Sequence, residues 1–260
     1  MVVSDVDNTP LTWRSNVMGT MPSIVFDLDS TLLDNSSYQD TLAEICRQVS
    51  ELHPGVEPRQ LQQANLTIWT SNKNRYMTEL WDGTKDTFSL GEEVWELTLA
   101  QCGIQSRSIA REAARIHDAT EAGHIRLYAD ARSAVQTLQQ AGIRMALVTN
   151  GPSQLQRRKI DILGIAPWFE AVLVSAEVGH SKPEPEIYML ALESLNADPK
   201  DAWFVGDNLY TDIAGANNVG MPSVWVNRTG EPLPPDAPVP THEVRTLAPL
   251  PGLMGLEPSA

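Results

Sequence analysis

IVFDLDST, at residues 24–31, is a short apolar run that ends in two carboxylates, Asp27 and Asp29. Contiguous large apolar residues are typical of a strand buried on both faces, as in a parallel sheet covered by helices. Ligands of open α/β sheets bind beyond the carboxyl ends of the strands. We therefore expect Asp27 and Asp29 to stand at the mouth of a binding site.

The two carboxylates have the chemistry that phosphoryl transfer through an aspartyl phosphate requires. Asp27 can attack phosphorus, and Asp29 can protonate the leaving oxygen and later accept a proton from the hydrolytic water. Because the nucleophile and the phosphate are both anions, Asp27 also needs a hard cation such as Mg²⁺. A simple turn after the strand is the alternative interpretation, since Asp and Ser are common turn formers.

The same acid, apolar, acid, polar, Thr pattern occurs once more, at residues 5–9. Only three residues other than Met1 precede this copy, and Pro10 follows it, so a central strand is poorly supported there. We favour the Asp27 copy and interpret residues 1–20 as an N-terminal extension.

Composition and charge argue against several classes of protein. The 260 residues carry 33 acidic and 19 basic side chains, a net charge of −14, which disfavours a nucleic-acid partner because such proteins cluster Lys and Arg. Cys46 and Cys102 form neither a disulfide framework nor a zinc site. Without a membrane-length apolar run or a signal peptide, the sequence predicts a cytoplasmic protein with no membrane partner.

The apolar periodicity after Asp34 becomes helical, as at Leu42, Ile45 and Val49. We predict a helical insert over residues 36–124, within an α/β core formed by residues 21–35 and 125–260. This core begins again with a helix closed by Gly142 and a strand over residues 145–148.

Polar residues follow three further predicted strands. Thr149, Asn150 and Gly151 come after the strand at 145–148, where a hydroxyl and backbone amides before a helix N-terminus can hold phosphate oxygens. A turn explains these residues equally well in isolation.

The strand at 171–174 is followed by Lys182, which Pro183 restricts, so its ammonium can neutralise charge on the phosphoryl group. An exposed surface Lys is the alternative interpretation for that residue alone.

The strand at 202–205 runs into Gly206 and Asp207, and Asp212 follows in the next helix. Gly206 lets the backbone pass close to a metal, Asp207 can bind that metal, and Asp212 can orient a water or Lys182. Helix capping would explain either Asp alone, but not four strand ends that carry complementary groups.

Taken together, these motifs resemble those of the haloacid dehalogenase superfamily, in the branch with a helical cap inserted after the first strand. The matching residues are Asp27, Asp29 and Thr31; Thr149 and Asn150; Lys182 and Pro183; and Gly206, Asp207 and Asp212. The resemblance implies an α/β fold with a doubly wound, mostly parallel sheet. It also implies Mg²⁺ held by Asp27, the carbonyl of Asp29 and Asp207, supported by Asn208 and Asp212, with Thr149, Asn150 and Lys182 on the substrate phosphate.

Asp29 favours phosphate chemistry over dehalogenation, because dehalogenases of this family lack a second Asp and need no acid for a halide leaving group. We expect a Mg²⁺-dependent phosphomonoesterase that acts on a small phosphorylated metabolite, such as a sugar phosphate, phosphoglycolate or a nucleotide. A phosphomutase is the first alternative, followed by a non-catalytic binding protein or a haloacid dehalogenase. The oligomeric state is not encoded in these motifs.

Overall fold

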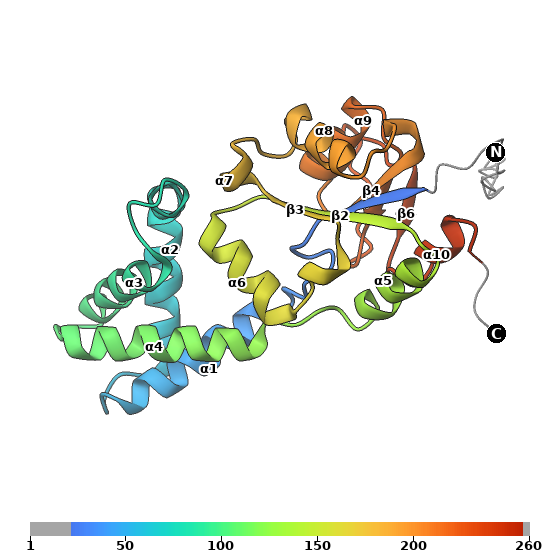
Figure 1. Ribbon diagram of the computed structural model, residues 1–260. Coiled ribbons are helices and arrows are strands. Elements are labelled where there is room, and N and C mark those ends of the chain that lie inside the picture. Colours follow the sequence, from blue (N-terminus) through green and yellow to red (C-terminus); the bar gives the residue numbers. More distant parts are fainter. Residues whose placement is uncertain (1–21, 257–260) are drawn as a thin grey trace.

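The computed structural model describes residues 22–256 (Figure 1). The second motif copy, at residues 5–9, lies outside the described residues. Within the described chain, six strands form one sheet in the order β3-β2-β1-β4-β5-β6, and every neighbouring pair is parallel. The strands are β1 (Ser23–Phe26), β2 (Arg144–Thr149), β3 (Ala171–Val174), β4 (Ala202–Gly206), β5 (Ser223–Val226) and β6 (His242–Val244).

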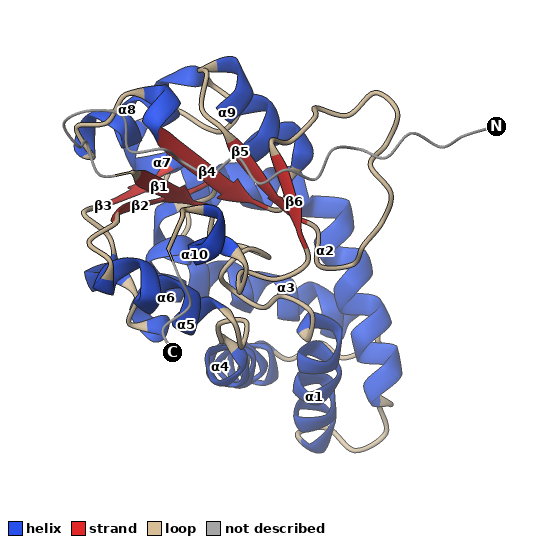
Figure 2. Cartoon of the chain, turned by 90° about the vertical axis from the view of Figure 1, so that its right-hand side faces the viewer, coloured by secondary structure: helices blue, strands red, loops and turns tan. Residues whose placement is uncertain are grey.

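Helices cover both faces of this sheet, as Figure 2 shows for the α/β part of the molecule. Ile24 and Phe26 of β1 pack into one apolar cluster with α5 (Ala131–Gln140), α6 (Ser153–Leu163) and α10 (Leu250–Leu253). Val25 points to the opposite face, because side chains alternate along a strand, and packs with α8 (Pro185–Ser194) and α9 (Ala214–Asn218). The predicted doubly wound α/β fold is confirmed.

In the described chain, four helices follow β1 before the chain reaches α5 and β2, which confirms the predicted helical insertion. They are α1 (Tyr38–Glu51), α2 (Pro58–Trp81), α3 (Thr87–Gln101) and α4 (Arg107–His124). They share an apolar cluster of their own that includes Leu42, Trp95 and Ala113, and they lie to one side of the sheet (Figure 1). The division into an insert at 36–124 and a core at 21–35 and 125–260 stays a prediction.

The strand β6 was not predicted from the sequence. It follows the Pro-rich residues 232–240 and pairs in parallel with β5, with Val226 opposite Val244.

Short elements link the other strands: η1 (Ala166–Trp168), α7 (Ser175–Val178), η2 (Pro199–Asp201) and η3 (Leu209–Ile213), the last of which is a π-helix. Every helix within residues 22–256 is too short or too polar to serve as a membrane span.

The central position of β1 brings its carboxyl end beside two others. Phe26 lies opposite Leu147 of β2 and Val205 of β4, and the backbone N–H of Asp27 donates to the Val205 carbonyl at 2.9 Å. The residues that follow β1, β2 and β4 therefore meet at one edge of the sheet.

Candidate active site

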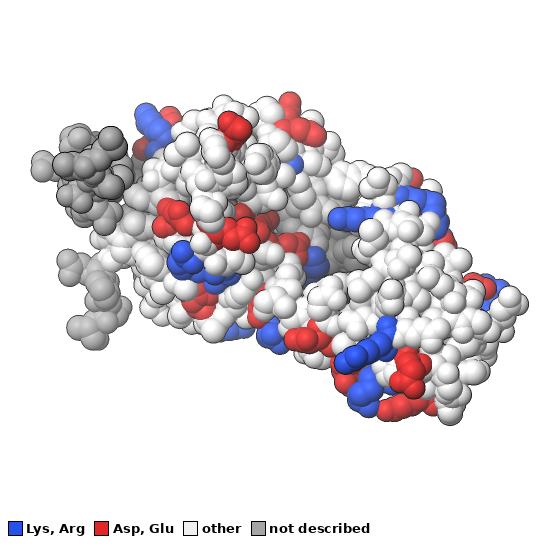
Figure 3. Space-filling view, turned by 180° about the vertical axis from the view of Figure 1, so that it is seen from behind, with Lys and Arg blue, Asp and Glu red and all other residues white. Residues whose placement is uncertain are grey.

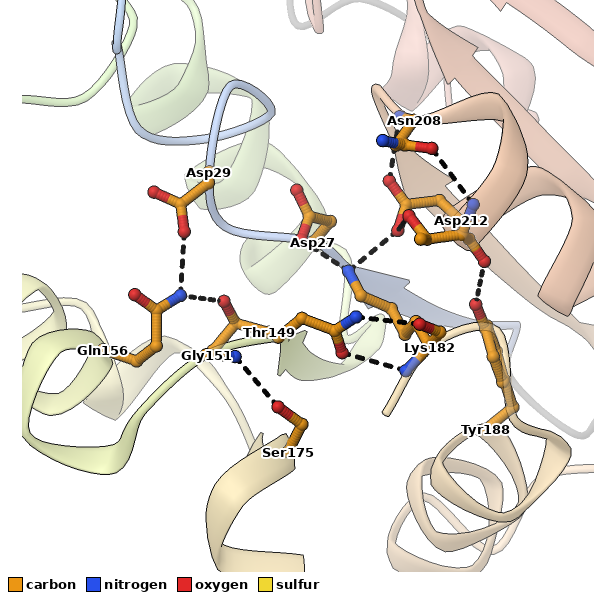
Figure 4. A network of polar contacts seen from close by, with 12 residues as sticks. Asp27, Asp29, Thr149, Gly151, Gln156, Ser175, Lys182, Tyr188, Asn208 and Asp212 are labelled. Atoms are coloured by element: carbon orange, nitrogen blue, oxygen red, sulfur yellow. Dashed lines mark hydrogen bonds and ion pairs between the residues drawn. The ribbon is translucent and has the colours of Figure 1, made fainter. Parts of the chain in front are cut away.

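A buried ion cluster lies at this edge, built from the end of β1, from η3 after β4 and from the loop before α8 (Figure 4). The Lys182 ammonium Nζ is 2.5 Å from Oδ1 of Asp27 and 2.8 Å from Oδ1 of Asp212. These side chains are almost wholly buried. Buried charges persist only when they are paired, so the cluster fixes Lys182 between two carboxylates.

The cluster carries more negative charge than Lys182 can balance. Burial raises the pKa of the Asp27 carboxyl above its ordinary value, Lys182 opposes that rise, and Asp212 adds to it. Burial together with Asp212 raises the pKa of Asp207 to about 6. Burial alone would lower the pKa of Lys182, but Asp212 and Asp27 hold it above its ordinary value. An additional cation would relieve this repulsion between carboxylates.

The carboxylates also have the geometry of a metal site. Oxygen atoms of Asp27, Asp207 and Asp212 lie within 4.8 Å of one another. Hard divalent cations such as Mg²⁺ prefer carboxylate oxygens, so the donor set fits the predicted metal. Asp212 stands closer to this set than the sequence suggested, although one of its oxygens already pairs with Lys182.

Gly206 allows Asp212 to reach the cluster. A Cβ at position 206 would lie 2.3 Å from Oδ2 of Asp212, which leaves room for glycine alone. The same Oδ2 accepts a hydrogen bond from the backbone N–H of Asn208 at 3.0 Å. The Asn208 side chain in turn accepts from the N–H groups of Tyr210 and Thr211, so it caps η3 and supports Asp212 indirectly.

The polar residues after β2 contact the loop that carries Lys182. Asn150 Nδ2 donates to the carbonyl of Lys182 at 2.8 Å, and the Lys182 N–H donates to Asn150 Oδ1 at 2.9 Å. Thr149 is buried and its Oγ1 accepts from Nε2 of Gln156, which leaves its own O–H able to donate. The Gly151 N–H donates to Oγ of Ser175. Asn150 therefore positions Lys182, and the Thr149 hydroxyl is the freer group for an anion.

Asp29 points away from the ion cluster in Figure 4, toward α6. Its carboxylate accepts from Lys159 Nζ at 2.7 Å, from Gln156 Nε2 at 2.8 Å and from Asn35 Nδ2 at 3.3 Å. Burial alone would raise the pKa of Asp29, but these donors, Lys159 above all, lower it overall. In this conformation Asp29 is held as an ionised carboxylate.

Several contacting residues were missed by reasoning from the sequence. Gln156 and Lys159 lie three residues apart on α6, and this spacing puts both on one helix face. Their helix begins at Ser153, two residues after Gly151, so its first turn lies near the strand ends, but the sequence does not show which face of the helix meets them. Tyr188 of α8, whose hydroxyl donates to the Thr211 carbonyl, carried no comparable signal.

The molecular surface is hollowed beside this edge of the sheet. Figure 3 shows acidic side chains gathered on the α/β part and a recess between that part and the helical insert. A pocket whose lining includes Asp207 lies beside the ion cluster.

Comparison with known proteins finds a family model and relatives that match most of the chain. A family model described as haloacid dehalogenase-like hydrolase matches residues 21–220. The chain is 29% identical over 238 residues to human N-acylneuraminate-9-phosphatase, covering 89% of this chain and 93% of that protein. It is 31% identical over 208 residues to glyceraldehyde 3-phosphate phosphatase of Methanopyrus kandleri, covering 79% and 84% respectively.

Solved structures share the fold. The HAD-hydrolase YfnB from Bacillus subtilis, whose crystal structure contains magnesium, aligns with a TM-score of 0.62 and 22% identity. That alignment covers 92% of this chain and 100% of YfnB. At this level of identity the similarity concerns the fold alone, and it includes the helices inserted after the first strand.

Proposed function

The chain belongs to the haloacid dehalogenase-like hydrolase family, and we propose that it is a Mg²⁺-dependent phosphatase of a small phosphorylated metabolite, with Asp27 as the nucleophile. The observation that carries this proposal is the pairing of Asp27 with Lys182, at 2.5 Å, at the end of the central strand. A buried carboxylate held beside a buried ammonium is arranged for attack on an electrophile whose developing charge the ammonium can stabilise.

In the first step, a carboxylate oxygen of Asp27 forms a bond to phosphorus and the bond from phosphorus to the ester oxygen breaks. Asp29 gives its proton to the departing alcohol oxygen. Lys182 and the Thr149 hydroxyl stabilise the oxygens of the phosphoryl group as it moves. Because the pairing with Lys159 favours ionised Asp29, that ion pair must open before Asp29 can act as an acid.

In the second step, Asp29 accepts a proton from a water whose oxygen attacks phosphorus. The bond between phosphorus and Asp27 breaks, which releases inorganic phosphate and restores the Asp27 carboxylate. The ionised form of Asp29 that its hydrogen bonds favour is the form this step requires.

Asp27, Asp207 and the backbone carbonyl of Asp29 would hold Mg²⁺, with Asn208 and Asp212 supporting that arrangement. When bound, the ion would supply positive charge that offsets the repulsion between the nucleophile and the phosphate. The closeness of the Asp27, Asp207 and Asp212 oxygens, within 4.8 Å, supports this assignment.

The substrate class rests on the relatives. The names N-acylneuraminate-9-phosphatase and glyceraldehyde 3-phosphate phosphatase both describe hydrolysis of small phosphorylated molecules, which supports a substrate of that kind here.

The cysteines Cys46 and Cys102 are free thiols, in keeping with the predicted cytoplasmic location. That location stays a prediction.

The test is release of inorganic phosphate by the purified protein with Mg²⁺, over a panel of sugar phosphates, nucleotides and phosphoglycolate. Asp27→Asn should abolish release, and the same substitution at the exposed Asp161 of α6 is the matched control. Isomerised sugar phosphate without free phosphate would favour the phosphomutase alternative. Halide release from a haloacid without phosphate release would favour a dehalogenase.

A further inference from the structure

A cavity of about 300 Å³ lies between the inserted helices and α6. Its walls are mainly aromatic and aliphatic: Trp69, Leu80, Phe88, Leu90, Val94 and Leu155. This volume is at the lower end of the range of ligand sites, roughly 300–1,000 Å³. A dry cavity of about 150 Å³ is enough for benzene, so the space admits an aromatic ring or a medium alkyl chain. We call it the insert cavity.

One residue in the lining of the insert cavity, Lys159, contacts Asp29. A second hollow of about 90 Å³ shares Lys159 and Arg158 with it and extends to Asn35. Lys159 and Asn35 both donate to Oδ1 of Asp29. Lys159 therefore connects the carboxyl that we assign to protonate the leaving oxygen with the lining of both hollows.

The charged side chains in the lining all take part in ion pairs. Arg158 Nη1 lies 2.6 Å from an Asp118 oxygen and 3.5 Å from a Glu121 oxygen, and Lys159 is paired with Asp29. His117 accepts from the Trp95 indole N–H, and burial lowers its pKa, which favours the neutral ring. Counted together, the two acidic and two basic side chains of the lining add no net charge to the apolar walls.

We infer that the insert cavity receives the leaving group of the substrate and selects an apolar one, an alkyl or aromatic alcohol rather than a polyhydroxylated sugar. This inference rests on the proposed phosphatase function. Each methylene placed against these walls gains by leaving water, whereas each buried hydroxyl without a hydrogen-bond partner costs free energy. The observation that carries the inference is Lys159, which lines this apolar cavity and whose Nζ lies 2.7 Å from Oδ1 of Asp29.

The test compares ethyl phosphate, hexyl phosphate and glucose 6-phosphate. All three are esters of primary alcohols, so the chemical step is similar and the leaving-group pocket decides the difference. We expect kcat/KM for hexyl phosphate to exceed those for the other two by about tenfold or more. Equal values, or a preference for glucose 6-phosphate, would overturn the inference.

Two variants that alter the cavity, each with a matched control, test whether the preference for hexyl phosphate arises there. Gly91 lines it, and a Cβ there would meet only Ala114 at 3.7 Å, so Gly91→Leu should fill the space. Gly123→Leu, at an exposed position of α4, is its matched control. Trp69→Ala removes a wall, and Trp81→Ala, on the same helix but 41% exposed, is the control.

The readout is the ratio of hexyl to ethyl phosphate kcat/KM within each enzyme, because this ratio cancels differences in the folded fraction. Gly91→Leu and Trp69→Ala should each lower the ratio several-fold, while the control variants keep it. A ratio unchanged in both cavity variants contradicts the inference.

A binding measurement separates failure of this inference from failure of the phosphatase proposal. Hexylphosphonate and ethylphosphonate cannot be hydrolysed, and titration calorimetry with Mg²⁺ compares their Kd values without any turnover. Hexylphosphonate should bind about tenfold more tightly or better. Equal affinities refute the apolar subsite even in an active phosphatase, whereas a clear preference in a protein that hydrolyses no ester refutes only the proposed reaction.

Discussion

The side-chain amide of Asn150 makes two hydrogen bonds with the backbone of Lys182, one as donor at 2.8 Å and one as acceptor at 2.9 Å. This pair joins the end of β2 to the loop between α7 and α8, which carries Lys182. The Lys182 ammonium then reaches Asp27 from a fixed backbone. Asn150 thus acts on the site through the position of Lys182.

The first prediction follows from this pair. Asn150→Ala keeps the ammonium but releases its backbone, and a misplacement of about 1 Å can cost about 10²-fold in rate. We expect kcat to fall by about that factor in a phosphate-release assay, with circular dichroism unchanged. Asn72→Ala on α2 is the matched control and should have wild-type kcat. Wild-type kcat in Asn150→Ala would refute the positioning role.

The second prediction concerns Asp29. Asp29→Asn removes the proton donor but leaves the nucleophile, so kcat should fall by about 10²- to 10⁴-fold, the usual contribution of acid–base catalysis. The loss should be smaller for p-nitrophenyl phosphate than for alkyl phosphates, because a good leaving group needs no proton. An equal loss for both esters would argue against the acid role.

The third prediction concerns Gly206. An added methyl would lie 2.3 Å from the Asp212 carboxylate, so Gly206→Ala must displace Asp212 from Lys182. We expect lower activity and a lower Tm by differential scanning fluorimetry, because a buried ion pair is disrupted. Gly252→Ala in α10, where a Cβ has open space, should change neither quantity. Full activity in Gly206→Ala would show that Asp212 can move without consequence.

The fourth prediction concerns the metal. A chelator should stop phosphate release, and Mg²⁺ should restore it. Ca²⁺ should bind but inhibit, because its longer and more variable coordination disturbs the alignment of Asp27 with phosphorus. Asp207→Ala should raise the Mg²⁺ concentration required or abolish activity. Full activity in excess chelator would contradict the metal assignment.

Much of the fold could be predicted because the strands of a parallel sheet are continuous apolar runs. The runs at 24–26, 145–148 and 202–205 lie within β1, β2 and β4. β6 escaped prediction because His242, Glu243 and Val244 form a short, largely polar edge strand after a Pro-rich segment. Nothing in their pattern marks a strand until β5 supplies its partner.

The sequence predicts that the polar groups after the strands lie close together, because the carboxyl ends of parallel strands lie at one edge of the sheet. These groups are Asp27, Lys182, Asp207 and Asp212. The contacts of Asp29 with Gln156 and Lys159 could not, since they depend on which face of α6 turns toward β1. Sequence periodicity places two residues on one face of a helix, but only packing decides what that face meets.

Detection of a phosphoryl group on Asp27 is the most direct test of the central claim. The enzyme is mixed with Mg²⁺ and substrate, quenched in acid within a single turnover and digested for mass spectrometry. We expect the added mass of one phosphoryl group on the peptide containing residues 24–31, located on Asp27, and none in Asp27→Asn. Steady turnover by Asp27→Asn, or a phosphoryl group found on another residue, would contradict the account.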